Sequence, residues 1–475
     1  MSTANPLGIL LPGFEGPTLP AWLEARLRDG LAGVCLFGTN VETPEQLRAL
    51  TDAIHAANPR AIIAIDEEGG DVSRLYQRDG SPFPGNAVLG RMDDAAATEA
   101  VAARVGAELR AAGVDLTLAP DVDVNSNPLN PVIGVRSFGA EPGLVSRHAA
   151  AWVRGVQSMG VSACAKHFPG HGDTAQDSHL ALPQVDADQD TLAVRELPPF
   201  VAAIAAGTAT VMTSHIMVPS VDPDLPSTFS PTILQGLLRE GLGFRGVIVT
   251  DALDMAGASA DRGVPAAAVA ALAGGSDLLC LGTGNTDEEI GEIAAAISAA
   301  VEAGELLPAR LANAAQRCAA LGTHHRMRRR SPGPEGPEIV DAAAVAATFA
   351  VDDAARTLLA EDRPRVWLRL EPTANIAVGA SPWGPFAGGV APAATCGPDD
   401  DPEAFAASVP AGALAVVVGK DNHRHPWALA AIAAVRAQAD AVVVDMGWPG
   451  PEGADVRTYG ASRLVGDALA TLIGR

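Results

Sequence analysis

The densest group of polar residues in the chain is the segment 166–179, KHFPGHGDTAQDSH. Within it Asp177 and His179 are two residues apart, and a carboxylate that close can orient an imidazole and stabilise its charged form. The pKa of the histidine then rises above its ordinary value of roughly 6.5, so the side chain can donate and accept a proton near neutral pH. The segment therefore predicts an acid–base dyad of Asp177 and His179, with a solvent-exposed loop histidine as the alternative.

The same segment holds three histidines and two aspartates, a composition that metal sites also have. A helical H-x-x-x-H site needs two histidines one turn apart, and Pro169, Gly170 and Gly172 would break that helix. The glycines instead predict a long flexible loop that brings a catalytic group over a bound substrate. Lys166 and His167, at the root of this loop, are suited to binding hydroxyl groups. We therefore expect no metal, and no cofactor motif occurs elsewhere.

Two further segments place charged side chains where short apolar runs end. In VIVTDALDM, Asp251 is a candidate nucleophile, metal ligand or helix cap. In AIDEEGGDVSRL, Asp66 and Arg74 together offer a bidentate acceptor and a fork of donors to sugar hydroxyls or to a phosphate. Arg136 follows on a loop in GVRSFG, where a substrate contact is favoured over packing. No P-loop accompanies these residues, so they do not indicate a nucleotide site.

The elements that must position these residues follow from an alternation of strands and helices over the first 320 residues. Short, continuously apolar runs bounded by Gly, Pro, Asp or Asn are typical of parallel strands buried on both faces. They lie at 8–13, 33–38, 61–66, 115–120, 161–166, 209–215, 246–251 and 276–282. Stretches with helical spacing, such as 97–113 and 144–159, separate them. Eight such units fit a (β/α)₈ barrel better than the alternative, an open doubly wound sheet.

The positions of polar residues favour the barrel independently. Just past the carboxyl ends of the predicted strands stand Asp66, Asp121, Lys166 with His167, His215 and Asp251. Helix capping would explain one such residue but not all of them. Barrel enzymes build their active sites at this end of the strands. The sequence therefore predicts that these side chains meet in one site.

The alternation breaks at 324–337, HHRMRRRSPGPEGP, which is basic and then rich in Pro and Gly. In so acidic a chain this composition favours a linker or a patch between two domains over a nucleic-acid-binding tail. Further strand candidates follow at 365–370, 413–418 and 441–445, with Ala-rich helices between them. We predict a barrel over 1–323, a linker over 324–340 and a smaller C-terminal α/β sandwich domain over 341–475.

Composition excludes several classes of function. The 475 residues are 48% hydrophobic and 19% charged, which suits a chain with a sizeable core and not a disordered one. With 33 Lys and Arg against 56 Asp and Glu, the net charge of −23 repels phosphate backbones and anionic membranes. Five cysteines without a C-x-x-C pair indicate neither a disulfide framework nor a zinc site. The first residues lack signal-peptide features and no apolar run has transmembrane length, so we expect a cytoplasmic protein.

Four of these pieces, in this order, resemble glycoside hydrolase family 3: IDEEGG-x₃-R, GVRSFG, KHFPGHGDT with D-S-H, and TDALDM. They look most like its bacterial β-N-acetylglucosaminidase branch, and VVVDMGWP and TYGASR look more loosely like the two-domain members. The resemblance implies that Asp251 is the nucleophile and that His179 is the general acid/base, oriented by Asp177. It also implies that the sugar of the −1 subsite binds to Asp66, Arg74, Arg136, Lys166 and His167.

The resemblance implies a retaining, two-step reaction through a covalent glycosyl-aspartate, without cofactor or metal. The substrate would be a small oligosaccharide or glycoside derived from chitin or from peptidoglycan. Because a neutral histidine does not repel phosphate, phosphorolysis with inorganic phosphate, giving a sugar 1-phosphate, is the alternative. Substrate-assisted catalysis and an inactive sugar-binding protein are less favoured. The D-S-H dyad makes the second-domain acid of the family's β-glucosidases unnecessary, so the C-terminal domain is expected only to shape the leaving-group side.

Overall fold

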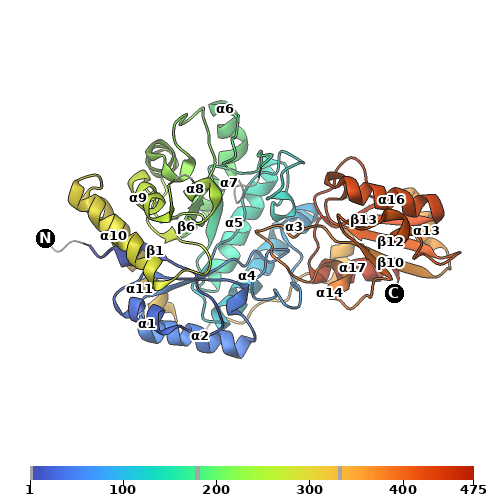
Figure 1. Ribbon diagram of the computed structural model, residues 1–475, viewed down its shortest axis with the longest axis horizontal. Coiled ribbons are helices and arrows are strands. Elements are labelled where there is room, and N and C mark those ends of the chain that lie inside the picture. Colours follow the sequence, from blue (N-terminus) through green and yellow to red (C-terminus); the bar gives the residue numbers. More distant parts are fainter. Residues whose placement is uncertain (1–3, 177–181, 261, 330–333, 475) are drawn as a thin grey trace.

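A ring of short parallel strands forms the centre of the N-terminal part of the protein (Figure 1). The computed structural model describes residues 4–176, 182–260, 262–329 and 334–474. Within these ranges the barrel strands are β1 (Leu10–Leu11), β2 (Gly33–Leu36), β3 (Ile62–Ile65), β4 (Leu116–Thr117), β5 (Cys164–Phe168), β6 (Thr210–Thr213), β7 (Val247–Val249) and β8 (Leu279–Cys280). Each one falls within or overlaps a predicted apolar run.

The strands close into a barrel through parallel pairing. β1 pairs with β8, and two ladders, β2–β3–β4 and β5–β6–β7, complete most of the ring. Parallel bridges Leu116–Ser162 and Val249–Leu278 join β4 to β5 and β7 to β8. The N–H of Cys35 donates to the carbonyl oxygen of Pro12 at 2.8 Å and joins β2 to β1. The predicted barrel is therefore confirmed over the open sheet.

Helices cover the outside of the barrel, and their ends carry the expected capping residues. The barrel helices are α1 (Ala21–Arg28), α2 (Pro44–Ala57), α3 (Asn86–Met92), α4 (Ala95–Ala111), α5 (Pro142–Ser158), α6 (Gln189–Thr191), α7 (Leu197–Ala205), α8 (Ala256–Ser259), α9 (Val264–Gly274), α10 (Asp287–Ala303) and α11 (Pro308–Arg328), with the π-helix η6 (Thr232–Gly241). In α10 Thr286 and Glu289 form a capping box, which satisfies two backbone N–H groups at the helix start. No described helix is both long enough and apolar enough to cross a membrane.

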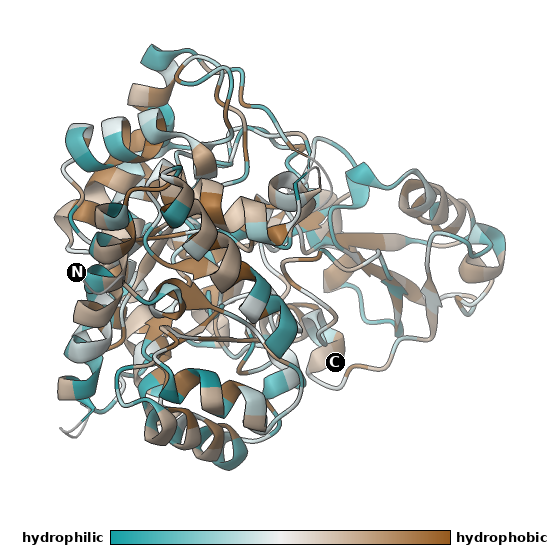
Figure 2. Cartoon of the chain, turned by 60° about the vertical axis from the view of Figure 1, so that its left-hand side comes forward, coloured by the Kyte–Doolittle hydropathy of each residue, from teal (hydrophilic) through white to brown (hydrophobic). Residues whose placement is uncertain are grey.

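Hydrophobic residues are concentrated on the strands at the centre of the barrel (Figure 2). Their buried side chains form one hydrophobic core with those of the surrounding helices. The residues of β2 and β3 are buried throughout, as their uninterrupted apolar sequences predict. All five cysteines are buried and form no disulfide, as expected from a sequence that indicates no disulfide framework.

The basic segment after the barrel differs from the predicted linker at its start. Helix α11 continues to Arg328, so residues 324–328 are helical. The ring of His325 is buried and lies 3.0 Å from the hydroxyl oxygen of Ser162, while Arg329 pairs with the buried Asp115. The basic residues therefore have partners at the foot of the barrel, which their composition alone did not reveal. The division of the chain into domains otherwise stays a prediction.

The C-terminal region contains a six-stranded sheet in the order β11-β10-β12-β13-β14-β9, counted over the described residues, with β9 antiparallel. The strands are β9 (Ala350–Val351), β10 (Arg365–Leu370), β11 (Ala394–Cys396), β12 (Leu414–Gly419), β13 (Ala441–Asp445) and β14 (Val456–Arg457). The helices are α12 (Ala342–Ala346), α13 (Asp353–Ala360), α14 (Gly384–Ala387), α15 (Pro402–Ala406), α16 (Pro426–Gln438) and α17 (Arg463–Ile473).

Alternate residues of the central strands enter two separate hydrophobic clusters. Val416 and Val418 pack with α12 and α17 on one face of the sheet, and Ala415 and Val417 pack with α15 and α16 on the other. This arrangement confirms the predicted α/β sandwich. The strands β9, β11 and β14 were not predicted because they have only two or three residues.

The carboxyl ends of the sandwich strands face the barrel. The amide of Asn375, in the loop after β10, donates to the carbonyl oxygen of Pro131 at 2.8 Å. Arg424, in the loop after β12, donates to the carbonyl oxygen of Asn130 at 3.1 Å. Both acceptors belong to the long loop after β4, so the two sets of strand-end loops meet between the domains (Figure 1).

Candidate active site

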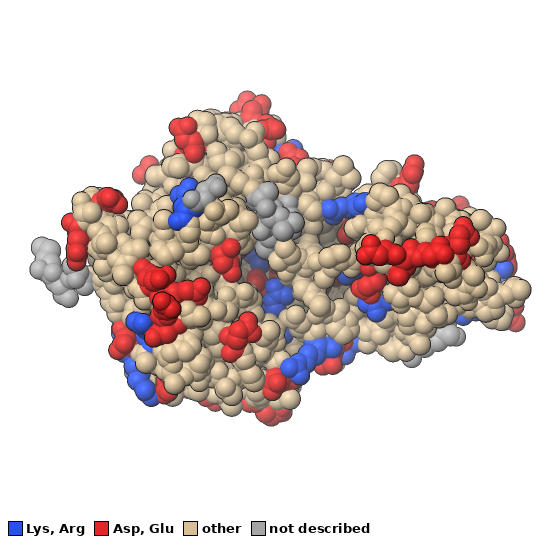
Figure 3. Space-filling view, viewed as in Figure 1, with Lys and Arg blue, Asp and Glu red and all other residues tan. Residues whose placement is uncertain are grey.

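A pocket at the carboxyl ends of the barrel strands brings together the described residues that were predicted as the nucleophile and as the sugar-binding residues. Its lining includes Asp66, Arg74, Arg136, Lys166, His167 and Asp251. Asp177 and His179 lie outside the described residues. Figure 3 shows charged side chains in a hollow near the centre of this face of the molecule.

Strand topology explains this convergence. Asp66 follows β3, Lys166 and His167 belong to the last part of β5, and Asp251 lies two residues beyond β7. Parallel strands of a barrel all end at one rim, so side chains distant in sequence meet there. Not all of the predicted strand-end residues reach the pocket, however. Asp121 and His215 are fully buried behind it.

His215 supports the backbone beside Asp251. Its Nε2 lies 3.0 Å from the carbonyl oxygen of Ala252, and its Nδ1 lies 2.9 Å from the hydroxyl oxygen of Thr228. Oδ1 of Asp251 accepts a hydrogen bond from the N–H of Ala252 at 2.8 Å. Ala252 is thus held at its carbonyl group by His215 and at its N–H group by the Asp251 carboxylate, which orients that carboxylate at the pocket.

Lys166 is held by two carboxylates. Its Nζ lies 2.8 Å from Oδ1 of Asp66 and 2.9 Å from Oε1 of Glu68, and its side chain is only 3% exposed. Burial alone would lower the pKa of Lys166, but the charges of Asp66 and Glu68 hold it above the ordinary value. The group therefore stays an ammonium that can donate to a bound hydroxyl or oxyanion.

Arg136 forms a two-pronged ion pair with the buried Glu68. Its Nε and Nη2 lie 3.0 and 2.8 Å from the two carboxylate oxygens. Burial opposes ionisation of Glu68, but Arg136 and Lys166 hold the pKa of this carboxyl well below its usual range. Glu68 was not predicted as a site residue. The only signal for it was its place in the DEEGG segment after β3, beside Asp66.

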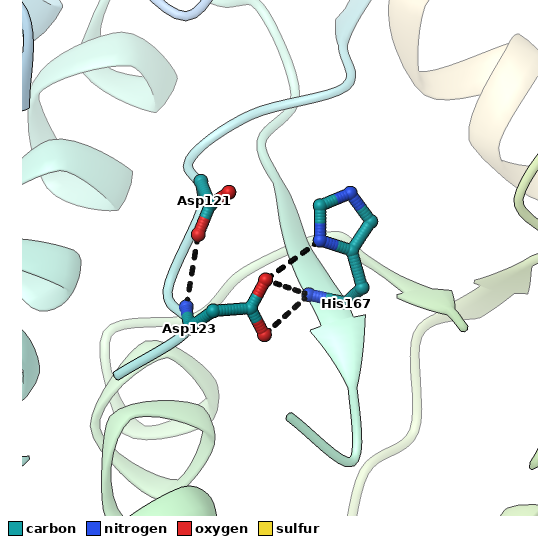
Figure 4. Close-up of side chains that lie close together, drawn as sticks. All are labelled: Asp121, Asp123 and His167. Atoms are coloured by element: carbon teal, nitrogen blue, oxygen red, sulfur yellow. Dashed lines mark hydrogen bonds and ion pairs between the residues drawn. The ribbon is translucent and has the colours of Figure 1, made fainter. Parts of the chain in front are cut away.

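His167 is oriented by a second unpredicted carboxylate, Asp123 (Figure 4). Nδ1 of His167 lies 2.7 Å from Oδ2 of Asp123, and Oδ1 of Asp123 accepts from the backbone N–H groups of His167 and His171. Burial opposes ionisation of Asp123, but the facing His167 lowers the pKa of this carboxyl. With Nδ1 held in this way, Nε2 of His167 is the ring atom left to contact a substrate.

Asp121, Asp123 and His167 place donor atoms within 4.8 Å of one another, which is the spacing of a metal site. Their atoms have other partners. Oδ1 of Asp121 accepts from the N–H of Asp123 at 3.0 Å, and Oδ2 lies 3.6 Å from Nη2 of Arg136. Burial and the nearby Asp123 raise the pKa of Asp121, which favours its neutral form. We therefore interpret the group as a support for His167 and assign no metal to it.

The loop after β5 packs tightly in its described part. A Cβ atom at Gly172 would lie 1.8 Å from the carbonyl oxygen of Val124, so no other residue fits there without movement of the backbone. His171 is buried, and burial lowers its pKa to about 4. Asp173 pairs with Arg195 at 2.6 Å. These contacts fix the root of the segment that leads to Asp177 and His179.

The C-terminal domain supplies one wall of the pocket. Arg74 donates to the carbonyl oxygens of Ala377 and Val378 at 2.7 and 3.0 Å, and its Nη2 lies 3.8 Å from Oδ2 of Asp66. Ile376 and Ala377 line the pocket directly. The loop after β10 therefore helps to position Arg74, a contribution that no sequence pattern indicated.

A barrel whose strand ends present carboxylates, an ammonium and guanidinium groups to one pocket defines a class of barrel enzymes suited to hydroxyl-rich substrates. Residues 23–321 match the family described as Glycosyl hydrolase family 3 N terminal domain. The chain therefore belongs to glycosyl hydrolase family 3, as its motifs predicted, and is a glycoside hydrolase.

Three known proteins illustrate what the chain is similar to. Beta-hexosaminidase A of Pseudoalteromonas piscicida is 42% identical over 265 residues, and the match covers 51% of this chain and 44% of that protein. Beta-hexosaminidase of Stenotrophomonas maltophilia (strain K279a) is 39% identical over 283 residues, and the match covers 57% of this chain and 82% of that protein. A solved family 3 beta-N-acetylglucosaminidase from Paenibacillus sp. str. FPU-7 is 29% identical, with a TM-score of 0.87 over 100% of this chain and 96% of that one. That match includes the C-terminal domain and confirms the two-domain fold.

Proposed function

We propose that this chain is a retaining β-N-acetylglucosaminidase that releases terminal β-linked N-acetylglucosamine from small glycosides. The observation that carries the proposal is the convergence of Asp251 with the Asp66–Lys166 ion pair and His167 in one pocket. The names of the two relatives and of the solved Paenibacillus enzyme support the choice of sugar.

The described residues are arranged to bind one sugar ring. Asp66 is an acceptor for hydroxyl protons, and its orientation is fixed by Lys166 at 2.8 Å. Lys166 and Arg74 supply donors, and Nε2 of His167 supplies one further contact. Most of these groups are already in place through partners within the protein, so little side-chain ordering is left for binding.

In the first step Asp251 attacks the anomeric carbon, and the bond from that carbon to the glycosidic oxygen breaks. Protonated His179, oriented by Asp177, donates its proton to the departing oxygen, and a glycosyl-aspartate forms. In the second step neutral His179 removes a proton from water, the water oxygen bonds to the anomeric carbon, and the bond to Asp251 breaks. The free sugar retains its β configuration.

The experiment that tests this scheme is covalent trapping. A fluorinated N-acetylglucosaminyl donor that reacts slowly should add one sugar mass to the protein, located on Asp251 by peptide mass spectrometry. Asp251→Asn should not be labelled and should lose nearly all turnover. Asp254→Asn is the matched control, because Asp254 also lines the pocket and accepts from the N–H of Thr283. Labelling of another residue in the wild-type protein would refute the nucleophile assignment.

Phosphorolysis is the second candidate function, because a neutral His179 would not repel an incoming phosphate. The pocket cations Lys166 and Arg136 already face the carboxylates of Asp66 and Glu68, and this pairing favours water over phosphate as the acceptor. Product analysis with and without phosphate separates the two. A sugar 1-phosphate, formed at a rate that rises with phosphate, would replace hydrolysis as the assigned reaction.

A further inference from the structure

Four side chains that point into the barrel line the most buried part of the active-site pocket. They come from the four even-numbered strands: Cys35 of β2, Leu118 directly after β4, Met212 of β6 and Cys280 of β8. Each of them is at most 3% exposed. Inside a (β/α)₈ barrel, one layer of side chains is contributed by alternate strands. The origin of these four residues is therefore that of a single layer at the bottom of the pocket.

The register from β2 to β4 supports a shared layer. Barrel strands are staggered by roughly one residue per strand, so a layer advances by about two residues at every second strand. Cys35 pairs with Ala64 of β3, and Ala64 pairs with Leu116 of β4. Leu118 follows Leu116 by two residues. Cys35 and Leu118 thus have the offset that one layer requires.

The register from β6 to β8 shows the same offset. Met212 pairs with Val249 of β7, and Val249 forms a parallel bridge to Leu278. Cys280 follows Leu278 by two residues. Met212 and Cys280 therefore lie at one height in the barrel, as neighbours around the layer.

The two cysteines are the next neighbours around the layer, with only β1 between their strands. Leu11 of β1 pairs with Cys280, and the carbonyl oxygen of Pro12 accepts from the N–H of Cys35 at 2.8 Å. The thiols interact with each other, and the nearby Cys280 together with burial holds the pKa of Cys35 well above its ordinary value. We call the three consecutive residues Met212, Cys280 and Cys35 the sulfur group.

Two thiols and one thioether form a set of soft ligands. Such ligands select Cu(I), whereas zinc sites in proteins use thiolate, imidazole and carboxylate ligands. When Cu(I) binds to both cysteines, two S–H bonds break, two Cu–S bonds form and two protons leave to solvent. Arg74 favours the thiolate of Cys35 and Asp66 opposes it. The metal ion itself must therefore supply most of the stabilisation of the two thiolates.

The sulfur group lies directly beneath the candidate nucleophile. Asp251 lines the pocket and follows Val249 by two residues. Because Val249 is the register partner of Met212, Asp251 stands one step nearer the rim, between β6 and β8. A metal ion held by the sulfur group would lie under the position that the proposed function gives to the sugar ring.

We propose that the sulfur group binds one Cu(I) ion, and that the bound ion inhibits the enzyme because it occupies the bottom of the sugar pocket. The inhibition rests on the proposed function, because it takes this pocket as the site of the terminal N-acetylglucosamine. The binding of copper does not rest on it. No C-x-x-C pair marks the site in the sequence, because the barrel and not the spacing brings these residues together.

The binding test titrates the protein with Cu(I) that is kept reduced by ascorbate and buffered by bicinchoninate without oxygen. Wild type should take up one ion per chain. Cys35→Ser and Cys280→Ser should each weaken binding more than about 100-fold, since residues that only orient a ligand already contribute about 10–100-fold. Met212→Leu should weaken it about tenfold, because a thioether is the weaker ligand. Cys396→Ser is the matched control, because Cys396 is also buried but lies on β11 of the C-terminal sheet, and it should bind copper like wild type.

The activity test follows cleavage of an aryl N-acetylglucosaminide with and without buffered Cu(I). Each rate is compared with the copper-free rate of the same variant, so that direct effects of a substitution on turnover cancel. Free Cu(I) at about ten times its Kd should raise the apparent KM of wild type and of Cys396→Ser about tenfold by mass action, with kcat unchanged. Cys35→Ser and Cys280→Ser should show no such rise at this concentration.

A measurement on wild type alone covers a variant that fails to fold. Saturating N-acetylglucosamine should weaken the binding of Cu(I), because the sugar and the ion share one pocket. If the copper-free protein failed to cleave the aryl glycoside, the proposed function would be wrong, but the copper stoichiometry would still test the sulfur group.

Three results would overturn the inference. Unchanged Cu(I) affinity in both Cys35→Ser and Cys280→Ser would place the copper elsewhere. Affinity for Zn(II) equal to that for Cu(I) would show that the group does not select a soft ion. Tight binding of one Cu(I) without a rise in the apparent KM would mean that the ion does not reach the sugar pocket.

Discussion

The two lysines of the chain have different electrostatic surroundings. Lys166 is enclosed at the end of a barrel strand by the carboxylates of Asp66 and Glu68, and its pKa is raised. Lys420 lies at the end of a sandwich strand and forms no ion pair with a described residue, and burial lowers its pKa. Three acidic residues oppose that shift electrostatically without reaching ion-pair distance: Asp71, Glu371 and Asp421. The comparison shows that the partners decide which charge state burial favours.

The same contrast occurs twice more around the pocket. Of the adjacent residues Glu67 and Glu68, only Glu68 faces a side-chain cation at ion-pair distance, and burial raises the pKa of Glu67 to about 7. Of Asp121 and Asp123, the pKa is raised in the first and lowered in the second, which faces His167. The ion-paired member of each pair lines or supports the proposed sugar site. Substitution of each member therefore tests whether ion pairing distinguishes the residues that serve the site from those that do not.

The largest expected effect is the difference in the free energy of unfolding between variants of the two lysines. Lys166→Met leaves Asp66 and Glu68 with less compensation for burial, and loss of one partner of a buried ion pair costs about 3–5 kcal/mol. Lys420→Met removes a cation that has no ion-pair partner among the described residues, and it should change the free energy of unfolding by less than about 1 kcal/mol. Urea unfolding of both variants measures this difference. Equal destabilisation would mean that Lys420 has a partner as strong as those of Lys166.

The adjacent glutamates should differ in how stability depends on pH. Because folding raises the pKa of Glu67 from 4.5 to about 7, the folded state binds more protons between these values. The contribution of Glu67 is therefore complete below about pH 4.5 and is lost as the pH rises through 7. At about 1.4 kcal/mol per pKa unit, this contribution to the free energy of unfolding amounts to up to about 3 kcal/mol.

Glu67→Gln should therefore become more stable relative to wild type between pH 5 and pH 8, whatever its stability at pH 5. Burial also raises the pKa values of Glu196 and Asp445 to about 7. Both groups are unchanged in the variant, so their contribution to the pH dependence is the same in variant and wild type and cancels in the comparison. Denaturant unfolding at four or five pH values gives the comparison. A difference between variant and wild type that does not vary with pH would contradict the raised pKa.

Variants of Asp121 and Asp123 should distinguish a role in catalysis from a role in packing. Asp123→Asn removes the carboxylate that holds Nδ1 of His167 at 2.7 Å, so we expect kcat/KM to fall about 100-fold and the pH profile to change. Asp121→Asn replaces a carboxyl whose pKa is raised, and should cost less than about fivefold. Kinetics on an aryl N-acetylglucosaminide, with folding checked by circular dichroism, decides the matter. Similar losses in both variants would assign both residues to packing.

The barrel could be predicted from the sequence because each barrel strand lies in a short apolar run that is bounded by Gly, Pro, Asp or Asn. The same local signals located the strand-end residues Asp66, Lys166, His167 and Asp251. Local patterns failed where a residue acts through a distant partner. Glu68 and Asp123 are ordinary acidic residues until the fold places Arg136 and His167 against them.

What the sequence by itself determined is therefore the order of strands, the family and the side chains at one rim of the barrel. Only the tertiary structure decided which charges are paired, that α11 extends through residues 324–328 to place His325 against the barrel, and that the loop after β10 holds Arg74. The physical reason is the same in each case. Burial and ion pairing depend on residues far apart in the chain, and their energies are defined only once packing brings those residues together.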